Sequence, residues 1–340
     1  MDASQRQLVE DIFEQSRRPS AKTWMKHGAF LLATFITTTI AGVLYPFGLI
    51  PVLPEVEPQT IPEAVNFVLS LPVRYLSLVG TAVTYLFTDL KYLTYGLSFS
   101  VSLLFILVSH EMGHYIACRI YKVDATLPFF IPTPPMVGPA GTFGAFIKIR
   151  SPMPSRKAVF DIGVAGPIAG FIALIPIAVI GVLTMEQTAA AQAAINPGIY
   201  FADPLFMRFI ASLAGVDLSL GVRNAFYFAA WVGLLVTALN LIPSGQLDGG
   251  HAVFAVLGER VHWWTGRIAF VVMAVLSIVG WLVYNSPSGF LIAVLLAVML
   301  KIRHPVPWDM SQLDTKRKAV AFLTLVIFIL CAMPFPIRIS

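Results

Sequence analysis

Two histidines and a glutamate stand close together in the sequence HEMGH, at residues 110–114. In an α-helix, residues i and i+4 project from the same face, so His110 and His114 can bind one metal ion between them. Glu111 lies beside the two histidines and can take a proton from a water molecule on that ion. Zinc lowers the pKa of such a water molecule to about 7, which makes hydroxide available at neutral pH. The pattern therefore predicts a zinc site that catalyses hydrolysis.

The segment before this motif is apolar. Residues 92–109 contain no charged side chain, so the motif comes at the end of a run that is suited to lipid. Ionisable side chains such as His110, Glu111 and His114 are costly inside a membrane helix and are functional candidates there by default. If these side chains were buried without a metal ion, the free-energy cost of removing them from water would not be offset. We therefore expect one bound Zn²⁺ ion rather than a chance match to the pattern.

A second polar segment, NLIPSGQLDGGH at residues 240–251, ends another apolar run. Catalytic zinc takes three protein ligands and a water molecule, so this segment can supply the ligand that the first motif lacks. Asp248 is a candidate because Gly249 and Gly250 allow the backbone to approach another element closely. His251 is a rival candidate because histidine is a common metal ligand. The alternative for the whole segment is a polar loop at the membrane surface.

The composition indicates that these motifs belong to a membrane protein. Of the 340 residues, 57% are hydrophobic and only 12% are charged, whereas soluble domains contain about 25% charged residues. Several apolar runs approach the ~20 residues with which a helix spans a bilayer. Odd and even positions of these runs are both apolar, which excludes the alternation of apolar and polar residues in a transmembrane β-barrel. The predicted fold class is an all-α polytopic membrane protein.

We expect about six to seven transmembrane helices. A Pro- and Gly-rich segment at 128–150 turns strand-like and is either a solvated loop or a re-entrant β-hairpin beside the zinc. The stretch 71–88 contains Arg74 and is predicted to be an interfacial or re-entrant helix. Gly166 and Gly170 form a G-x-x-x-G pattern, for which close helix packing is a sufficient role. The apolar runs predict spanning helices near 28–50, 95–121, 158–184, 225–243, 268–284, 289–302 and 318–336.

The basic residues predict the orientation of the chain. With the N-terminus in the cytoplasm, the cytoplasmic segments contain 18 of the 23 Lys and Arg residues, as the positive-inside rule requires. Both polar segments, 110–114 and 240–251, then lie toward cytoplasmic helix ends, where water can reach the zinc through a cavity. The net charge of +5 is explained by these loops, so no nucleic-acid partner is expected.

Taken together, HEMGH (110–114) and NLIPSGQLDGGH (240–251) resemble the motifs of the site-2 protease family, which are intramembrane zinc metalloproteases. The resemblance extends through residues 141–171 and, more weakly, into residues 303–318. The run Ser-Gly-Gln at 244–246 is similar to the cyanobacterial and plastid branch. The chain lacks the peptide-binding insert of the enterobacterial members.

This resemblance implies that His110, His114 and Asp248 bind one zinc ion and that Glu111 is the general base. It also implies that Asn240 lies near the substrate carbonyl, where its amide could donate to the developing oxyanion. The expected reaction is hydrolysis of peptide bonds within or near transmembrane helices of other proteins, such as membrane-anchored regulators (regulated intramembrane proteolysis). The expected place is the lipid bilayer of a cell membrane or a thylakoid-type membrane, with the active site toward the cytoplasmic side.

The domain organisation follows the same reading. No loop can hold a further globular domain of about 100 residues. We expect a cytoplasmic N-terminal segment at 1–27, a first transmembrane helix with an interfacial segment at 28–94, a catalytic membrane core at 95–318 and a C-terminal transmembrane helix at 319–340.

Two other functions use a similar pattern. A prenyl-protein protease would need a glutamate as third ligand, but the later residues Glu186 and Glu259 fall in predicted loops. A metal transporter would need polar residues along a path across the bilayer, and the outer halves of the predicted helices offer few. A non-proteolytic metal-binding protein would not need Glu111.

A helical substrate presents a further requirement. Its carbonyls are hydrogen-bonded and covered, and backbone groups that are freed in lipid have no water to bind. We therefore expect the substrate to unwind near the cut site. The edge of a strand in 141–149 could pair with the freed backbone by β-strand addition.

Overall fold

The computed structural model describes residues 4, 7–8, 19–51, 59–187, 199–302 and 304–339, and these form a mostly helical protein. Most of the predicted cytoplasmic segment 1–27 lies outside the described residues. The helices are α2 (Ala21–Val43), α3 (Ile61–Thr88), α4 (Leu90–Ile120), α5 (Arg156–Leu183), α7 (Leu205–Ala214), α8 (Ala225–Asn240), α9 (Asp248–Leu257), α10 (Glu259–Tyr284), α11 (Ser288–Met299) and α12 (Thr315–Cys331). The strands are β1 (Phe129–Pro132), β2 (Thr142–Phe146), β3 (Glu186–Gln187), β4 (Ile199–Phe201), β5 (Gly221–Val222) and β6 (Ile337–Ile339).

Each of the predicted helices is present, but their ends differ from the ends of the apolar runs. The first helix begins at Ala21 rather than near residue 28, because the side chain of Ser20 caps it by accepting a hydrogen bond from the Thr23 N–H. An N-cap of this kind fixes where a helix starts whether or not the first turns are apolar. The apolar run therefore located the helix but not its first residue.

Fewer helices reach spanning length than the predicted six to seven. Within the described residues, α3, α4, α5 and α10 are the four that are long and apolar enough to cross a membrane, judged by length and composition. Helices α8 and α11 have 16 and 12 residues, which correspond to about 24 and 18 Å at the α-helical rise. The apolar runs 225–243 and 289–302 also include residues of the adjoining turns, so they are longer than the helices α8 and α11 themselves.

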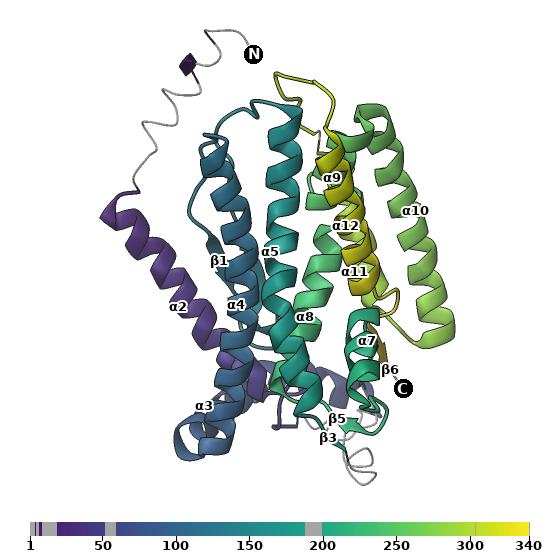
Figure 1. The fold of residues 1–340 in the computed structure, drawn as a ribbon. Helices are drawn as coiled ribbons and strands as arrows, with labels where there is room; N and C mark the ends of the chain where they lie inside the picture. The colour runs from purple at the N-terminus through teal and green to yellow at the C-terminus, as the bar shows by residue number, and fades with distance from the viewer. Residues whose placement is uncertain are drawn as a thin grey trace.

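The stretch 71–88 belongs to α3, a continuous helix of 28 residues. Because this helix does not reverse direction, the re-entrant alternative is wrong. Its buried residues are Ala82 and Leu86, and these pack with Val43 and Leu44 at the end of α2. Figure 1 draws α3 at the end of the bundle opposite to α9. The length and composition of α3 are those of a membrane span, and its contacts are confined to its last turns.

The core of the bundle is formed by α4, α5 and α8. Its fully buried side chains include Phe99, Leu103, Leu174 and Trp231. Helices α4 and α5 approach closely at Gly113, where a Cβ atom would collide with the backbone of α5 at Ala165. A glycine at this position therefore sets the helix spacing at the level of the HEMGH motif.

The connections at the two ends of the bundle differ in charge. In Figure 1 the connections α4–α5, α9–α10 and α11–α12 lie at one end, while α3, α7 and the strands β3 to β6 lie at the other. The first end thus gathers the described parts of the basic segments 119–157, 258–267 and 301–318. The predicted orientation requires the basic connections to lie on one side of the membrane, and this arrangement of the connections agrees with it.

Strands β1 and β2 form an antiparallel hairpin between α4 and α5, which confirms that this segment contains the predicted β-hairpin. Phe129 lies opposite Phe146, and the pairing continues as a bridge between Ala125 and Ile149. Helix α2 supports the turn of the hairpin, because the Thr37 hydroxyl donates a hydrogen bond of 2.8 Å to the carbonyl of Gly141. Gly141 has φ +77°, where a side chain would be strained.

Candidate metal centre

The three predicted ligands come together at one point of the bundle. His110 and His114 extend from α4, and Asp248 is the first residue of α9. The two Nε2 atoms are 3.2 Å apart, and the Oδ2 atom of Asp248 lies 3.3 Å from His110 Nε2 and 3.4 Å from His114 Nε2. Ligands held about 2.0 Å from a tetrahedral zinc ion lie about 3.3 Å from one another. The triangle therefore has the size that a zinc ion requires.

A hydrogen bond of His114 determines which of its ring nitrogens can bind a metal ion. Its Nδ1 atom lies 2.7 Å from the carbonyl oxygen of Ile162. A carbonyl accepts but does not donate, so Nδ1 carries the proton and Nε2 keeps its lone pair. An oriented imidazole of this kind is typical of metal ligands. Among the residues that the structure describes, His110, His114 and Asp248 are the group of His, Cys, Asp and Glu side chains that could hold a metal ion.

Two glycines of α5 make room for the histidines. A Cβ atom at Gly166 would overlap the imidazole of His114, and one at Gly170 would lie 3.1 Å from the Cβ of His110. The G-x-x-x-G pattern thus has the packing role that was expected of it. The surface of α4 that packs here carries the two candidate ligands His110 and His114, so this packing also shapes the candidate site.

Glycines also place the third ligand. Cβ atoms at Gly249 and Gly250 would collide with backbone atoms of Leu241 and Gly245 respectively. The chain can therefore fold back tightly before α9 only with glycine at these positions. This fold brings Asp248, rather than His251, to the two histidines of α4.

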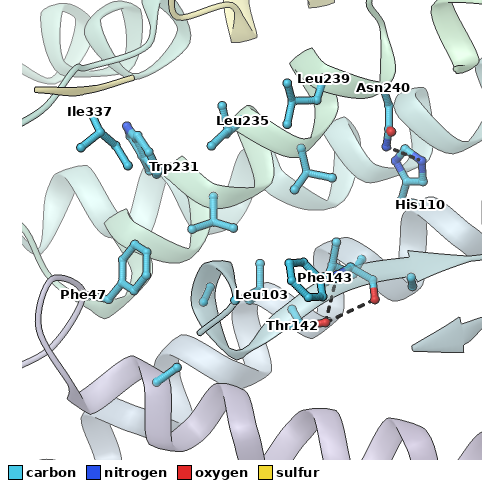
Figure 2. A pocket seen from close by; sticks show the side chains of 18 of the residues that line it. Phe47, Leu103, His110, Thr142, Phe143, Trp231, Leu235, Leu239, Asn240 and Ile337 are labelled. Atoms are coloured by element: carbon cyan, nitrogen blue, oxygen red, sulfur yellow. Dashed lines mark hydrogen bonds between the residues drawn. The ribbon is translucent and has the colours of Figure 1, made fainter. Parts of the chain in front are cut away.

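Glu111 and Asn240 complete the group. Glu111 is buried next to its two histidine neighbours, and its carboxylate accepts a hydrogen bond from the backbone N–H of Ile147, just after β2. The side-chain nitrogen of Asn240, at the end of α8, lies 3.4 Å from His110 Nε2 (Figure 2). The structure therefore gathers all five residues singled out in the sequence.

Two cavities meet at these residues. The first has a volume of about 540 Å³ and is mostly apolar. Figure 2 shows Trp231, Leu235 and Leu239 along one face of α8, with Leu103 and Phe143 across from them. The second cavity has a volume of about 490 Å³ and is lined by the three candidate ligands, residues 145–149, Gly163 and His251. His110, Glu111 and Asn240 line both cavities, so the candidate site lies at the junction of an apolar and a polar space.

One group near the site was not anticipated. His251 contacts His304, with 2.7 Å between His251 Nδ1 and His304 Nε2. The two residues are 53 positions apart in the chain, and nothing in the sequence around His304 indicates the contact. Tertiary packing alone brings them together.

Comparisons with known proteins agree with this geometry. The Arabidopsis thaliana protein "Probable zinc metalloprotease EGY1, chloroplastic" is 30% identical over 247 residues, which cover 70% of this chain and 43% of that protein. Its namesake from Oryza sativa subsp. japonica is 28% identical over 255 residues, which cover 72% and 42%. "Probable zinc metalloprotease EGY2, chloroplastic" of Arabidopsis thaliana is 24% identical over 253 residues, which cover 74% and 44%. The chain spans less than half the length of these relatives.

The chloroplastic relatives confirm the resemblance to the plastid branch. The sequence profile of peptidase family M50 matches residues 98–280, which is more than half of the chain. The matched region contains HEMGH at 110–114, the segment 240–251 and the hairpin between α4 and α5. It thus includes all the residues that form the candidate metal centre, and the chain belongs to peptidase family M50.

Proposed function

We propose that this protein is an intramembrane zinc metalloprotease that hydrolyses peptide bonds within or near the transmembrane helices of membrane-anchored proteins. The observation that carries the proposal is the zinc-sized triangle of His110, His114 and Asp248, with Glu111 beside it. The zinc metalloprotease names of the relatives support the same chemistry. The spanning-length helices support a substrate that also lies in the bilayer.

Each residue of the site has a separate task in this proposal. His110, His114 and Asp248 hold one zinc ion, which when bound supplies a Lewis acid at the scissile carbonyl and a lowered pKa for water. Glu111 takes the proton of the attacking water and passes it to the leaving amine, as a general base and then a general acid. The amide of Asn240 donates a hydrogen bond to the oxygen on which negative charge develops.

The apolar cavity limits how the substrate binds. One turn of α-helix is about 10–12 Å wide and 5.4 Å high, so it occupies on the order of 500 Å³. The cavity of about 540 Å³ therefore accommodates about one turn, whereas a spanning helix has ~20 residues. We infer that a short, locally unwound segment binds, with its apolar side chains between α4 and α8.

The hairpin offers partners for the unwound backbone. The Thr126 N–H donates to the carbonyl of Lys148, and the Arg150 N–H donates to the carbonyl of Asp124. Backbone groups alternate in direction along a strand, so those of Ile147 and Ile149 face the opposite way, toward the polar cavity that both residues line. The N–H of Ile147 donates to Glu111, so the carbonyl of Ile147 and the backbone groups of Ile149 are the ones offered to a substrate. Pairing of the substrate with this edge would replace the hydrogen bonds that it loses on unwinding.

The place in the membrane is part of the same proposal. With the basic connections in the cytoplasm, the metal centre lies toward the cytoplasmic side, because α9 is at that end of the bundle. We propose a thylakoid-type membrane or a cell membrane as the location; the names of the relatives place those proteins in the chloroplast. We retain the topology of six to seven crossings, in which the short helices α8 and α11 cross within the bundle.

The test is a cleavage assay with the purified, detergent-solubilised protein and a panel of single-span substrates. We expect one zinc ion per chain and cleavage that a chelator abolishes. Glu111→Gln should lose cleavage and keep its zinc, because the base is lost while the ligands remain. Normal cleavage by this variant, or loss of its zinc, would contradict the proposed role of Glu111.

A further inference from the structure

A chain of hydrogen bonds runs from the protein surface to the polar cavity through two histidines. His304 Nδ1 lies 2.8 Å from the carbonyl oxygen of Pro305, and His304 Nε2 lies 2.7 Å from His251 Nδ1. The imidazole of His304 is held in place by stacking on Phe254, with ring centroids 3.9 Å apart and an interplanar angle of 14°. The three groups are thus held in a fixed order.

This order determines the position of every proton when both rings are neutral. The carbonyl of Pro305 only accepts, so His304 Nδ1 must carry a proton and His304 Nε2 must not. His304 Nε2 therefore accepts from His251 Nδ1, which leaves His251 Nε2 with a lone pair. Burial lowers the pKa of His251 to about 4 and that of His304 to about 3, so both rings are neutral near pH 7.

His251 lies where a substrate backbone would pass. It is three residues after Asp248 on α9, so both residues are on the same face of that helix. A Cβ atom at Gly163 would lie 2.7 Å from the Cβ of His251, so no side chain of α5 at this position covers the ring. His251 lines the polar cavity together with Glu111 and residues 145–149. With Nδ1 engaged by His304, the remaining polar atom is Nε2.

We propose that His251 Nε2 accepts a hydrogen bond from a backbone N–H of the bound substrate, on the edge of the substrate strand that faces away from residues 145–149. The inference rests on the proposed proteolytic function. A strand presents N–H groups on both of its edges in alternation, and pairing with Ile147 and Ile149 satisfies only one edge. Once the bound substrate fills the cavity and excludes water, an unpaired N–H on the other edge is costly. A hydrogen bond from this N–H to the lone pair of His251 Nε2 removes part of that cost.

Two variants separate this role from a structural one. In His251→Gln the side-chain amide reaches the position of Nε2 and offers an acceptor there, but the bond to His304 is lost. In His251→Asn the amide reaches the position of Nδ1 and keeps a donor to His304, but the acceptor toward the cavity is lost. We expect the asparagine variant to lose about tenfold in kcat/KM and the glutamine variant to lose clearly less. Both variants should retain the zinc of the unmodified protein.

The opposite order, or equal losses in the two variants, would overturn the proposal, because His251 would then act through His304. Loss of zinc from both variants would also overturn it and would identify His251 as a metal ligand. A measurement on the substrate does not depend on the folding of either variant. Ester bonds replace single peptide bonds around the cut site, which removes one N–H at a time. If no ester slows cleavage by the unmodified protein at least fivefold, the proposal fails.

Binding measurements distinguish this inference from the proposed function. In the Glu111→Gln background, which should not cleave, the affinity of the same single-span peptide is compared with and without His251→Asn. Weaker binding with the asparagine substitution supports the hydrogen bond even if no proteolysis is found. Unchanged binding, in a protein whose unmodified form cleaves this peptide, overturns the inference and leaves the proposed function intact.

Discussion

The side chains at the candidate metal centre are held by contacts that a single methyl group would disturb. His114 has its Nδ1 bonded to Ile162 and its ring against Gly166. A Cβ atom at Gly166 would displace the ring from the position in which it makes this hydrogen bond. In metal-binding histidines, the ring nitrogen that does not bind the metal usually has a hydrogen-bond partner. Loss of that partner typically lowers the metal affinity 10–100-fold. The site is therefore sensitive to small changes in α5.

This sensitivity leads to a prediction for Gly166→Ala. The added Cβ would overlap the imidazole of His114, so we expect at least tenfold weaker zinc binding and lost cleavage. Metal analysis after dialysis against a weak chelator measures the effect. The matched control is Gly80→Ala in α3, where a Cβ meets nothing within 4 Å and alanine favours the helix. Normal zinc content in the Gly166 variant would contradict the assignment of His114 as a ligand.

Among the elements, the hairpin and α8 border the two cavities, so we expect changes in them to affect the substrate more than the metal. We predict that Phe146→Pro reduces turnover at least tenfold without displacing zinc. By the same alternation the N–H of Phe146 faces β1, opposite Phe129, so proline weakens the pairing that holds the substrate-facing edge in place. Phe146→Ala is the control, since it shortens an exposed side chain but keeps the N–H. Equal activity of the two variants would show that the strand edge does not bind the substrate.

Helix α8 provides a separate test of the apolar cavity. Leu235 lines this cavity on the same face as Trp231 (Figure 2). Leu235→Trp should fill part of the volume, raise KM several-fold for substrates with large apolar residues beside the cut, and leave zinc content unchanged. Leu291→Trp serves as the control, because Leu291 is exposed on α11. A substrate panel with Ala, Leu and Phe beside the cut site measures the difference. Uniform effects on all three would argue against binding in this cavity.

For the whole molecule, the position of the site relative to the membrane depends on which end of the bundle is cytoplasmic. We predict that Pro152→Cys, between α4 and α5, is labelled by a membrane-impermeant maleimide from the cytoplasmic side. Ser219→Cys, at the other end, should be labelled from the opposite side. Both are made in a background without Cys118 and Cys331, which are free and buried. The reverse result would invert the topology and place the metal centre toward the other side of the membrane.

The sequence alone determined the features that depend on local chemistry. His110, Glu111 and His114 share one helical turn, so their proximity follows from helix geometry without any knowledge of the fold. The low charge content indicated a membrane protein, and the Pro- and Gly-rich segment after α4 left a solvated loop and a β-hairpin as the two alternatives. The ends of the helices did not follow from the sequence, because an apolar run shows which residues suit lipid and not where hydrogen bonding ends a helix.

The tertiary structure decided the features that depend on contacts between distant segments. Asp248 and His251 lie on the same face of α9, and their residue types made both plausible ligands. Only the packing of α9 against α5, and the contact of His251 with His304, bring Asp248 to the histidines of α4. The apolar cavity is likewise a property of how α4, α8 and β2 are spaced. Such spacing follows from the packing of many side chains together, which no short stretch of sequence records.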